Sequence, residues 1–297
     1  MIVLRYFLIL HLLYQIQIEY WEKQLTSTEN ELQENLTVMK IQCGSFMKNT
    51  MTGAVPVSLA GIFLVLILEG CGMKTDVNKT NMKKLIVKEI DHKGVIDLDL
   101  AEQLLENNAE FQFIETINWA EYPYKPEVKF KMAYCKNQIF LKYYVNEENI
   151  MARETRVNGD VYKDSCVEFF VSTNGKKTYY NFEFNCVGIP HVGYGPGREN
   201  RALIDPEILK LIKVRSSLGN QPFEERTGRH QWEMMIVMPK ECLIYDKDIV
   251  LKGLKANANF YKCGDETSKP HFVTWNPIGT ETPDYHQPAY FGELSFE

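Results

Sequence analysis

The fold class of this chain is indicated most clearly by residues 165–186, which read SCVEFFVSTNGKKTYYNFEFNC. Two runs that alternate apolar and polar residues lie on either side of Asn174-Gly175, a dipeptide typical of turns. One face of the first run carries Ser165, Val167, Phe169 and Val171, and one face of the second carries Tyr180, Phe182 and Phe184. Because successive side chains of a strand point to opposite faces, the pattern predicts two strands that each bury one face.

The same period of two recurs along the rest of the chain. Further apolar faces are formed by Val128-Phe130-Met132, Ile139-Leu141-Tyr143 and Met234-Ile236-Met238, with turn signals at Cys135-Lys136-Asn137 and Asn158-Gly159-Asp160. One early helix is expected over residues 97–107, where Asp97 is the N-cap of an apolar stripe. Several short strands joined by turns predict an all-β fold, an antiparallel β-sandwich with a short N-terminal helix.

Composition limits the class of protein further. The chain has 297 residues, of which 45% are hydrophobic and 24% are charged, as in an ordinary globular protein. Its formal charge is −6, from 33 basic and 39 acidic residues, and no Lys/Arg cluster occurs. Phosphate binding requires a basic face, so a nucleic-acid partner is not expected.

The first third of the chain is typical of a targeting region. A largely apolar run over residues 54–68 follows Lys48 and ends in Leu68-Glu69-Gly70-Cys71, which describes a secretory signal peptide. The Cys that follows Gly70 resembles the lipobox of bacterial lipoproteins. We therefore expect residues 1–46 to be an upstream extension, 47–70 a signal peptide, 71–84 a linker and 85–297 the folded domain, with a lipid on Cys71. The protein would then be anchored in the bacterial cell envelope, periplasmic or surface-exposed.

Two alternatives to a lipid anchor remain open. A single membrane span is one, although about 15 apolar residues are fewer than the roughly 20 that cross a bilayer. Translation from Met82 is the other, because it would remove the signal and leave a cytoplasmic protein.

Polar residues on the opposite strand faces suggest a binding surface. Three predicted strands present acids, amides and a tyrosine at alternate positions: Asp164 and Glu168, then Asn181, Glu183 and Asn185, then Asn257, Asn259 and Tyr261. A solvated sheet face is the ordinary explanation of such alternation. However, Asn is depleted in strands, and amides beside carboxylates offer the paired donors and acceptors that suit the hydroxyl groups of a sugar.

Several motifs in order resemble the family 9 carbohydrate-binding modules, and most closely their DOMON-like branch from Bacteroides-type bacteria. The resemblance covers residues 117–297 and rests on residues 164–171, 179–185, 259–265, 271–275 and 288–292. It implies an immunoglobulin-like or DOMON-like β-sandwich that holds a sugar between aromatic rings, with charged and amide side chains around it.

The resemblance assigns roles to particular residues. Trp275 matches the late aromatic platform of the family, and Tyr162 is the candidate for the early one, where no Trp occurs. A place in the hydrophobic core is the alternative for Trp275. Structural calcium is implied by the resemblance alone, with Asp160, Asp164 and Asp265 as candidate ligands.

A glycine-rich segment over residues 188–201 is expected to form a long loop at the rim of the site. Arg153 and Arg198 are the candidate arginine ligands, and Arg198 or Arg201 would reach a sugar hydroxyl or Glu168. Surface salt bridges are the ordinary alternative for these arginines.

Non-catalytic carbohydrate binding in support of carbohydrate catabolism is therefore the expected function. A glycoside hydrolase is one alternative, because Glu168 and Glu183 on neighbouring strands would lie at a separation that paired catalytic carboxyl groups use. A structural lipoprotein that contacts another protein through its polar face is the other.

Overall fold

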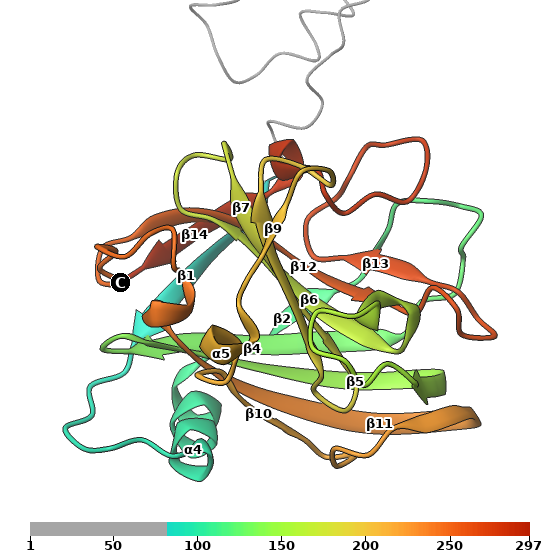
Figure 1. Ribbon diagram of the computed structural model, residues 1–297, viewed down its shortest axis with the longest axis horizontal. Helices are drawn as coiled ribbons and strands as arrows, with labels where there is room; N and C mark the ends of the chain where they lie inside the picture. Colours follow the sequence, from blue (N-terminus) through green and yellow to red (C-terminus); the bar gives the residue numbers. More distant parts are fainter. Residues whose placement is uncertain (1–81) are drawn as a thin grey trace, which may run out of the picture. The chain divides into compact units, whose positions relative to one another are not determined.

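The computed structural model describes residues 82–297, which fold into two facing β-sheets (Figure 1). The first sheet contains β3 (Thr116–Ile117), β13 (Phe272–Thr274), β12 (Lys255–Cys263), β6 (Cys166–Ser172), β7 (Tyr179–Asn185), β8 (Pro190–Gly195), β9 (Ala202–Leu203) and β14 (Gly292–Phe296). The second contains β2 (Gln112–Ile114), β4 (Glu127–Cys135), β5 (Gln138–Ala152), β11 (Phe223–Pro239) and β10 (Lys213–Ser216). Two α-helices, α4 (Leu98–Asn108) and α5 (Pro206–Leu209), and three short 3₁₀ turns, η1 (Val161–Lys163), η2 (Lys240–Cys242) and η3 (Pro288–Tyr290), complete the described part.

Strand β1 (Lys84–Glu89) joins the two sheets. It pairs in parallel with β14 of the first sheet and with β4 of the second, whereas the other pairs are antiparallel. The all-β sandwich predicted from the period of two is confirmed. The expected helix is also confirmed, because α4 begins after Asp97, whose carboxylate accepts from the backbone N–H of Leu100 at 2.9 Å.

The core between the sheets is built from the apolar strand faces. The ring of Phe260 stacks on Phe130 of the opposite sheet, with centroids 3.9 Å apart, and lies 5.0 Å from that of Phe169 on its own sheet. Trp275 belongs to this core, since it is 1% exposed and meets Phe260 edge-on at 5.5 Å. Burial of such large rings supplies much of the driving force for folding, at about 1.5 to 3 kcal/mol each.

Helix α4 covers the outer face of the second sheet (Figure 1). Its apolar stripe packs on Phe140 and neighbouring residues of the sheet, and its acids reach two lysines of the sheet. Lys131 pairs with Glu106 at 2.9 Å, and Lys142 pairs with Glu106 at 2.8 Å and with Glu102 at 2.6 Å. Burial alone would raise the pKa of Glu106, but hydrogen bonds from Lys142, Tyr144 and Lys131 outweigh it and lower the pKa to about 2.

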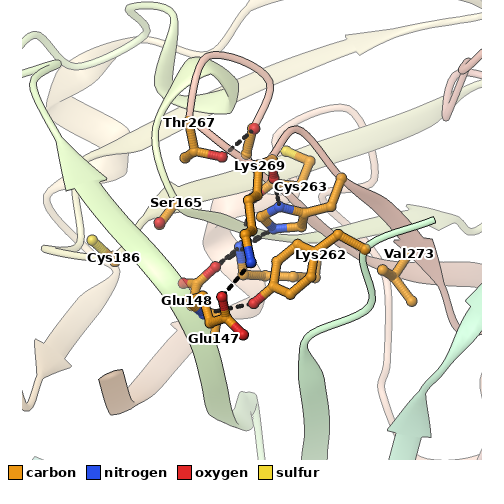
Figure 2. A network of polar contacts seen from close by, with 12 residues as sticks. Glu147, Glu148, Ser165, Cys186, Lys262, Cys263, Thr267, Lys269 and Val273 are labelled. Carbon is orange, nitrogen blue, oxygen red and sulfur yellow. Dashed lines mark hydrogen bonds and ion pairs between the residues drawn. The ribbon is translucent and has the colours of Figure 1, made fainter. Parts of the chain in front are cut away.

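A buried polar network links Glu147 of β5 in one sheet with Lys262 of β12 in the other (Figure 2). The Lys262 ammonium pairs with the Glu147 carboxylate at 2.7 Å, and both side chains are 0% exposed. Lys262 also donates to the carbonyl of Cys263 at 2.7 Å and to Nε2 of His271 at 2.8 Å. The second oxygen of Glu147 accepts from the indole N–H of Trp232 at 2.8 Å. The two charges are therefore compensated, as a buried pair requires.

Parts of the predicted organisation lie outside the described residues. These are the extension over 1–46, the signal peptide over 47–70, Cys71 and the linker as far as residue 81. Within residues 82–297, no helix has the length and apolar character needed to cross a membrane.

Candidate functional site

The outer face of the first sheet brings together side chains from four neighbouring strands. The register places Tyr261 of β12 opposite Glu168 of β6, Glu168 opposite Glu183 of β7, and Glu183 opposite His191 of β8. Directly opposite residues on one face have Cβ atoms about 5 Å apart, so the four side chains form one row. The cluster formed by five residues is called the outer-face site below: Glu168, Asn181, Glu183, Arg198 and Arg201.

The two glutamates of the outer-face site are buried and close together. Glu168 is 3% exposed and Glu183 is 4% exposed. Burial raises the pKa of both carboxyl groups, and the charge of Glu183 adds to the rise at Glu168. Asn181 donates from its Nδ2 to Glu183 at 2.6 Å, and the nearby charges of His191, Arg201 and Arg198 oppose the rise at Glu183. The pair therefore favours a state in which at least one carboxyl group keeps its proton.

Arg201 lies across the polar strand face. Its guanidinium sits 4.6 Å from the ring centroid of Tyr179, hydrogen-bonds to Oδ1 of Asn181 and donates to the carbonyl of Gly197 at 2.7 Å. Glycine on β8 makes room for this side chain: a Cβ on Gly193 would lie 3.0 Å from Nε of Arg201, and one on Gly195 would lie 3.2 Å from its Cγ. Glycine at these two positions therefore leaves room for the arginine.

The prediction that residues 188–201 form a long loop is wrong. Residues 190–195 form strand β8, paired with β7 along its whole length, and only the turn that follows it lies at the rim. Glycine and proline are unfavourable in strands, so the period of two did not predict β8.

Arg198 and Tyr162 stand at the edge of the site. The Arg198 side chain is 56% exposed and pairs with Asp284 at 2.8 Å. Its charge opposes the rise that burial causes in the pKa of Glu168, Glu183 and Asp265. Tyr162 is 37% exposed, and burial together with the charges of Asp160, Asp265 and Glu183 raises the pKa of its phenol. Tyr162 is thus an accessible ring near Glu183, and its role as the early platform stays a prediction.

Trp275 is a correction to the predicted site. The indole is enclosed by Phe130 and Phe260 between the sheets and is 1% exposed, so it cannot stack on a ligand at the surface. Trp275 is buried because its backbone N–H bonds to the carbonyl of Phe260, which directs the side chain into the core. The alternative of a core tryptophan is the one that the structure supports.

Three predicted amide ligands serve the fold. The Asn259 side chain is fully buried, accepts from the N–H of Asn276 at 2.8 Å and donates to its carbonyl at 3.0 Å. Asn257 is directed to the carbonyl of Gly292 on β14, at 3.4 Å. Asn185 donates to the carbonyl of Glu154 at 3.0 Å and accepts from the N–H of Ile189 at 2.9 Å. The structure does not bring these three amides into the outer-face site.

Arg153 also lies apart from the cluster. Its Nε donates to Glu224 of β11 at 2.7 Å, and half of its side chain is exposed. This is the surface ion pair that was the ordinary alternative for the arginines.

The predicted calcium ligands do not fit a calcium site. The Asp164 carboxylate accepts from the N–H groups of Arg153 and Glu154, both at 2.9 Å, and from Asn185 at 3.0 Å, so N–H donors occupy its oxygens. Asp160 pairs with Lys163 at 3.3 Å. Among residues 82–297, Asp160, Asp164 and Asp265 do not form a group whose ligand atoms converge.

Loop residues that the sequence did not predict for the site enclose it. Trp119, Tyr285 and Phe291 pack over the outer face, on a cluster with Phe170 and Tyr261 of the sheet. The period of two within a strand does not show which loops enclose its face. The enclosing residues lie more than 40 residues away from β6 in the sequence. The polar face is consequently much more buried than a solvated sheet face.

Comparisons with known proteins identify the family. The family model for carbohydrate-binding family 9 matches residues 99–296. A proposed carbohydrate-binding protein from Bacteroides uniformis has 43% sequence identity and a TM-score of 0.70, over 73% of this chain and 100% of that protein. A family 9 module from Caldicellulosiruptor kristjanssonii, solved with cellotriose, has 14% identity and a TM-score of 0.44, over 72% of this chain and 94% of that one.

A curated relative is more distant. An uncharacterized protein of Acanthamoeba polyphaga mimivirus is 29% identical over 123 residues, which are 36% of this chain. The match spans only 20% of the length of that relative.

The family model and the Bacteroides relative together support non-catalytic carbohydrate binding as the function. The chain belongs to carbohydrate-binding family 9.

Proposed function

We propose that the chain binds its carbohydrate at the outer-face site and the adjacent ring of Tyr162. The observation that carries the proposal is the alignment of Glu168 and Glu183 across two neighbouring strands. Asn181 and Arg201 are hydrogen-bonded within the same cluster, and the charge of Arg198 acts on both glutamates. These groups come from separate strands and a turn, so the fold, not local sequence, assembles them.

The chemistry of the cluster suits vicinal hydroxyl groups. Carboxyl and amide oxygens accept hydrogen bonds, whereas guanidinium and amide N–H groups donate them, and a sugar hydroxyl does both. Nε of Arg201 is a buried donor without a partner among the described residues, which a polar ligand would satisfy. Each neutral hydrogen bond contributes about 0.5 to 1.5 kcal/mol net. A few such bonds with one stacking ring give an expected Kd in the micromolar to millimolar range, about −8 to −4 kcal/mol.

Substitution of the edge residues tests the site without disturbing the core. A glycan array first identifies a sugar, and calorimetry then compares Tyr162→Ala with Phe113→Ala. Phe113 is an aromatic residue of the other sheet that is 51% exposed, against 37% for Tyr162. Arg198→Ala is compared with Arg229→Ala, whose side chain is 73% exposed on β11. We expect at least tenfold weaker binding in Tyr162→Ala and Arg198→Ala and none of this loss in the controls. Equal affinities in all four variants would place the sugar elsewhere.

A further variant, Glu168→Gln, separates binding from hydrolysis. Glu168→Gln keeps the size of the side chain but cannot exchange a proton with a glycosidic oxygen. If the protein released reducing sugar from the bound glycan, and Glu168→Gln abolished the release, the site would be catalytic. Unchanged glycan after prolonged incubation is the result expected for a binding module.

We propose in addition that Cys71 carries a lipid that anchors the protein in the bacterial cell envelope, periplasmic or surface-exposed. The motif Leu68-Glu69-Gly70-Cys71 after an apolar run supports this proposal. Metabolic labelling with an alkyne fatty acid should mark the full chain and Cys43→Ser but not Cys71→Ser. A labelled Cys71→Ser protein, or a mature N-terminus at Met82, would contradict the lipid anchor.

A further inference from the structure

Two thiols and a carboxylate converge on the outer face of the first sheet beside the outer-face site. Cys166 of β6 and Cys263 of β12 are direct register partners, and Glu168 lies two residues beyond Cys166 on the same strand face. The thiol of Cys263 donates to Oε1 of Glu168 at 3.1 Å. Among residues 82–297, these three form the one group of possible metal ligands whose atoms all lie within 4.8 Å of one another.

A fourth oxygen lies next to this group. The loop after β12 is held against η1 by a bond from the N–H of Asp265 to the carbonyl of Tyr162 at 3.3 Å. This places the Asp265 carboxyl group beside the thiol of Cys263. Oδ1 of Asp265 is buried and has no hydrogen-bond partner among the described residues. An unsatisfied buried acceptor is costly, and a bound cation would remove that cost.

The spacing of the three ligand atoms of Cys166, Glu168 and Cys263 is near that of a zinc site. Zinc bonds sulfur at about 2.3 Å and carboxylate oxygen at about 2.0 to 2.2 Å, which places neighbouring ligand atoms roughly 3.5 to 3.8 Å apart. Ligand atoms that already lie within 4.8 Å of one another would reach this spacing by small rotations of the side chains. Two thiolates with carboxylates select a borderline-soft cation such as Zn²⁺ over Ca²⁺ or Mg²⁺, which prefer oxygen ligands alone.

We propose that Cys166, Cys263 and Glu168, with Asp265 as the fourth ligand, form a binding site for Zn²⁺. Binding displaces the two thiol protons, and any proton held by the carboxyl groups of Glu168 and Asp265, to solvent. Two zinc–sulfur and two zinc–oxygen bonds form, with no change of oxidation state. The metal would use Oε1 of Glu168, the oxygen that now accepts from Cys263. The zinc site would therefore fix the orientation of one glutamate of the outer-face site without occupying the rim at Tyr162 and Arg198.

Metal titration of the full chain tests the proposal. Cys43 and Cys71 are changed to Ser so that thiols outside the described residues cannot bind metal, and the protein is reduced and stripped of metal by a chelator. Competition with a chromophoric chelator should then show one Zn²⁺ per chain, and Co²⁺ should give a thiolate charge-transfer absorption band. In this background Cys166→Ser and Cys263→Ser should each weaken Zn²⁺ binding at least 100-fold, and Asp265→Asn about tenfold.

The matched control is Cys186→Ser, which removes another fully buried thiol, one that donates to the carbonyl of Met151 at 3.4 Å. It should keep full Zn²⁺ affinity. Near-ultraviolet circular dichroism of the metal-free variants shows whether each is folded, and the Co²⁺ band reports on the thiolates themselves. Absence of stoichiometric Zn²⁺ binding in the folded parent protein, or equal loss in Cys166→Ser and Cys186→Ser, would overturn the proposal. A Cys166–Cys263 disulfide that resists the reductant would also overturn it, because oxidised sulfur is no thiolate ligand. Sugar titrations on the same samples show separately whether the outer-face site binds.

Discussion

Removal of the ammonium group from the buried network should destabilise the fold strongly. In Lys262→Met, the Glu147 carboxylate loses its partner at 2.7 Å while remaining 0% exposed. Trp232 still donates to one of its oxygens, but the other keeps only Nε2 of His271, at 3.5 Å. A charge left unpaired in the interior typically costs about 3 to 5 kcal/mol. For a domain of this size, that cost should lower the thermal midpoint by about 10 °C.

The double variant isolates the cause of this loss. Lys262→Met with Glu147→Gln removes both charges and keeps the packing volume, so its free energy of unfolding should recover to within about 2 kcal/mol of the natural protein. Urea unfolding monitored by tryptophan fluorescence measures the stability of the natural protein, the two single variants and the double variant. A cost below about 1 kcal/mol for Lys262→Met, or a double variant as unstable as the worse single one, would refute the assignment of a compensated buried pair.

The pH dependence of the same variant provides a second measurement. Burial, and then the charge of Lys262, hold the pKa of His271 well below 6.5, so the folded protein keeps this ring neutral while the unfolded chain binds a proton below pH 6.5. The natural protein therefore loses stability from this group as the pH falls. In Lys262→Met the second cause is gone and Glu147 faces the imidazole, so the pKa of His271 should rise. The stability gap between the two proteins should narrow from pH 8 to pH 5, whereas an unchanged gap would exclude this role of His271.

Three further predictions concern other parts of the molecule. Gly193→Ala would place a Cβ 2.9 Å from Oδ1 of Asn181 and should cost about 1 to 3 kcal/mol and weaken sugar binding, whereas Gly197→Ala meets nothing within 4 Å and should do neither; calorimetry and urea unfolding compare them. The lowered pKa of Glu106 means that its contribution to stability is present above pH 4.5 and is lost as the pH falls toward 2, so urea titrations of Glu106→Gln should approach those of the natural protein over that interval. Burial first, and then the charge of Glu183, raise the pKa of Asp265 from 3.8 to about 7, so the metal-free protein should lose stability relative to Asp265→Asn as the pH rises over that interval.

The sequence predicted the strands in which apolar and polar residues alternate strongly. It did not predict β8, whose glycines make room for a neighbouring side chain. Val167, Phe169 and Phe182 alternate with polar residues, so β6 and β7 and their apolar face were predicted correctly. Strand β8 was missed because Gly193 and Gly195 lower strand propensity, and they are needed there by Arg201, whose position only the fold reveals.

The site was predicted in part for a related reason. Glu168, Asn181 and Glu183 were predicted from residue type and strand face, and Arg198 from its place in an expected loop. The structure places the four near one another. Asn259 has the same residue type on the same sheet face, yet it holds the turn at Asn276. Periodicity assigns a side chain to a face but does not show which loops fold over that face, and this cover separates ligand candidates from structural amides.

The burial of Trp275 changes the energetics expected of sugar binding but not its location. A ring can stack on a pyranose only if one of its faces is open, and of the two predicted platforms Tyr162 is 37% exposed whereas Trp275 is 1% exposed. The hydrogen-bonding groups of the outer-face site lie beside Tyr162 and do not depend on the indole. A site with one ring covers less apolar area on binding than a site that holds the sugar between two rings, so its affinity should be weaker than that of a two-ring site. Selectivity would then come mainly from Glu168, Glu183 and the arginines, because a mismatched hydroxyl leaves a buried polar group unpaired.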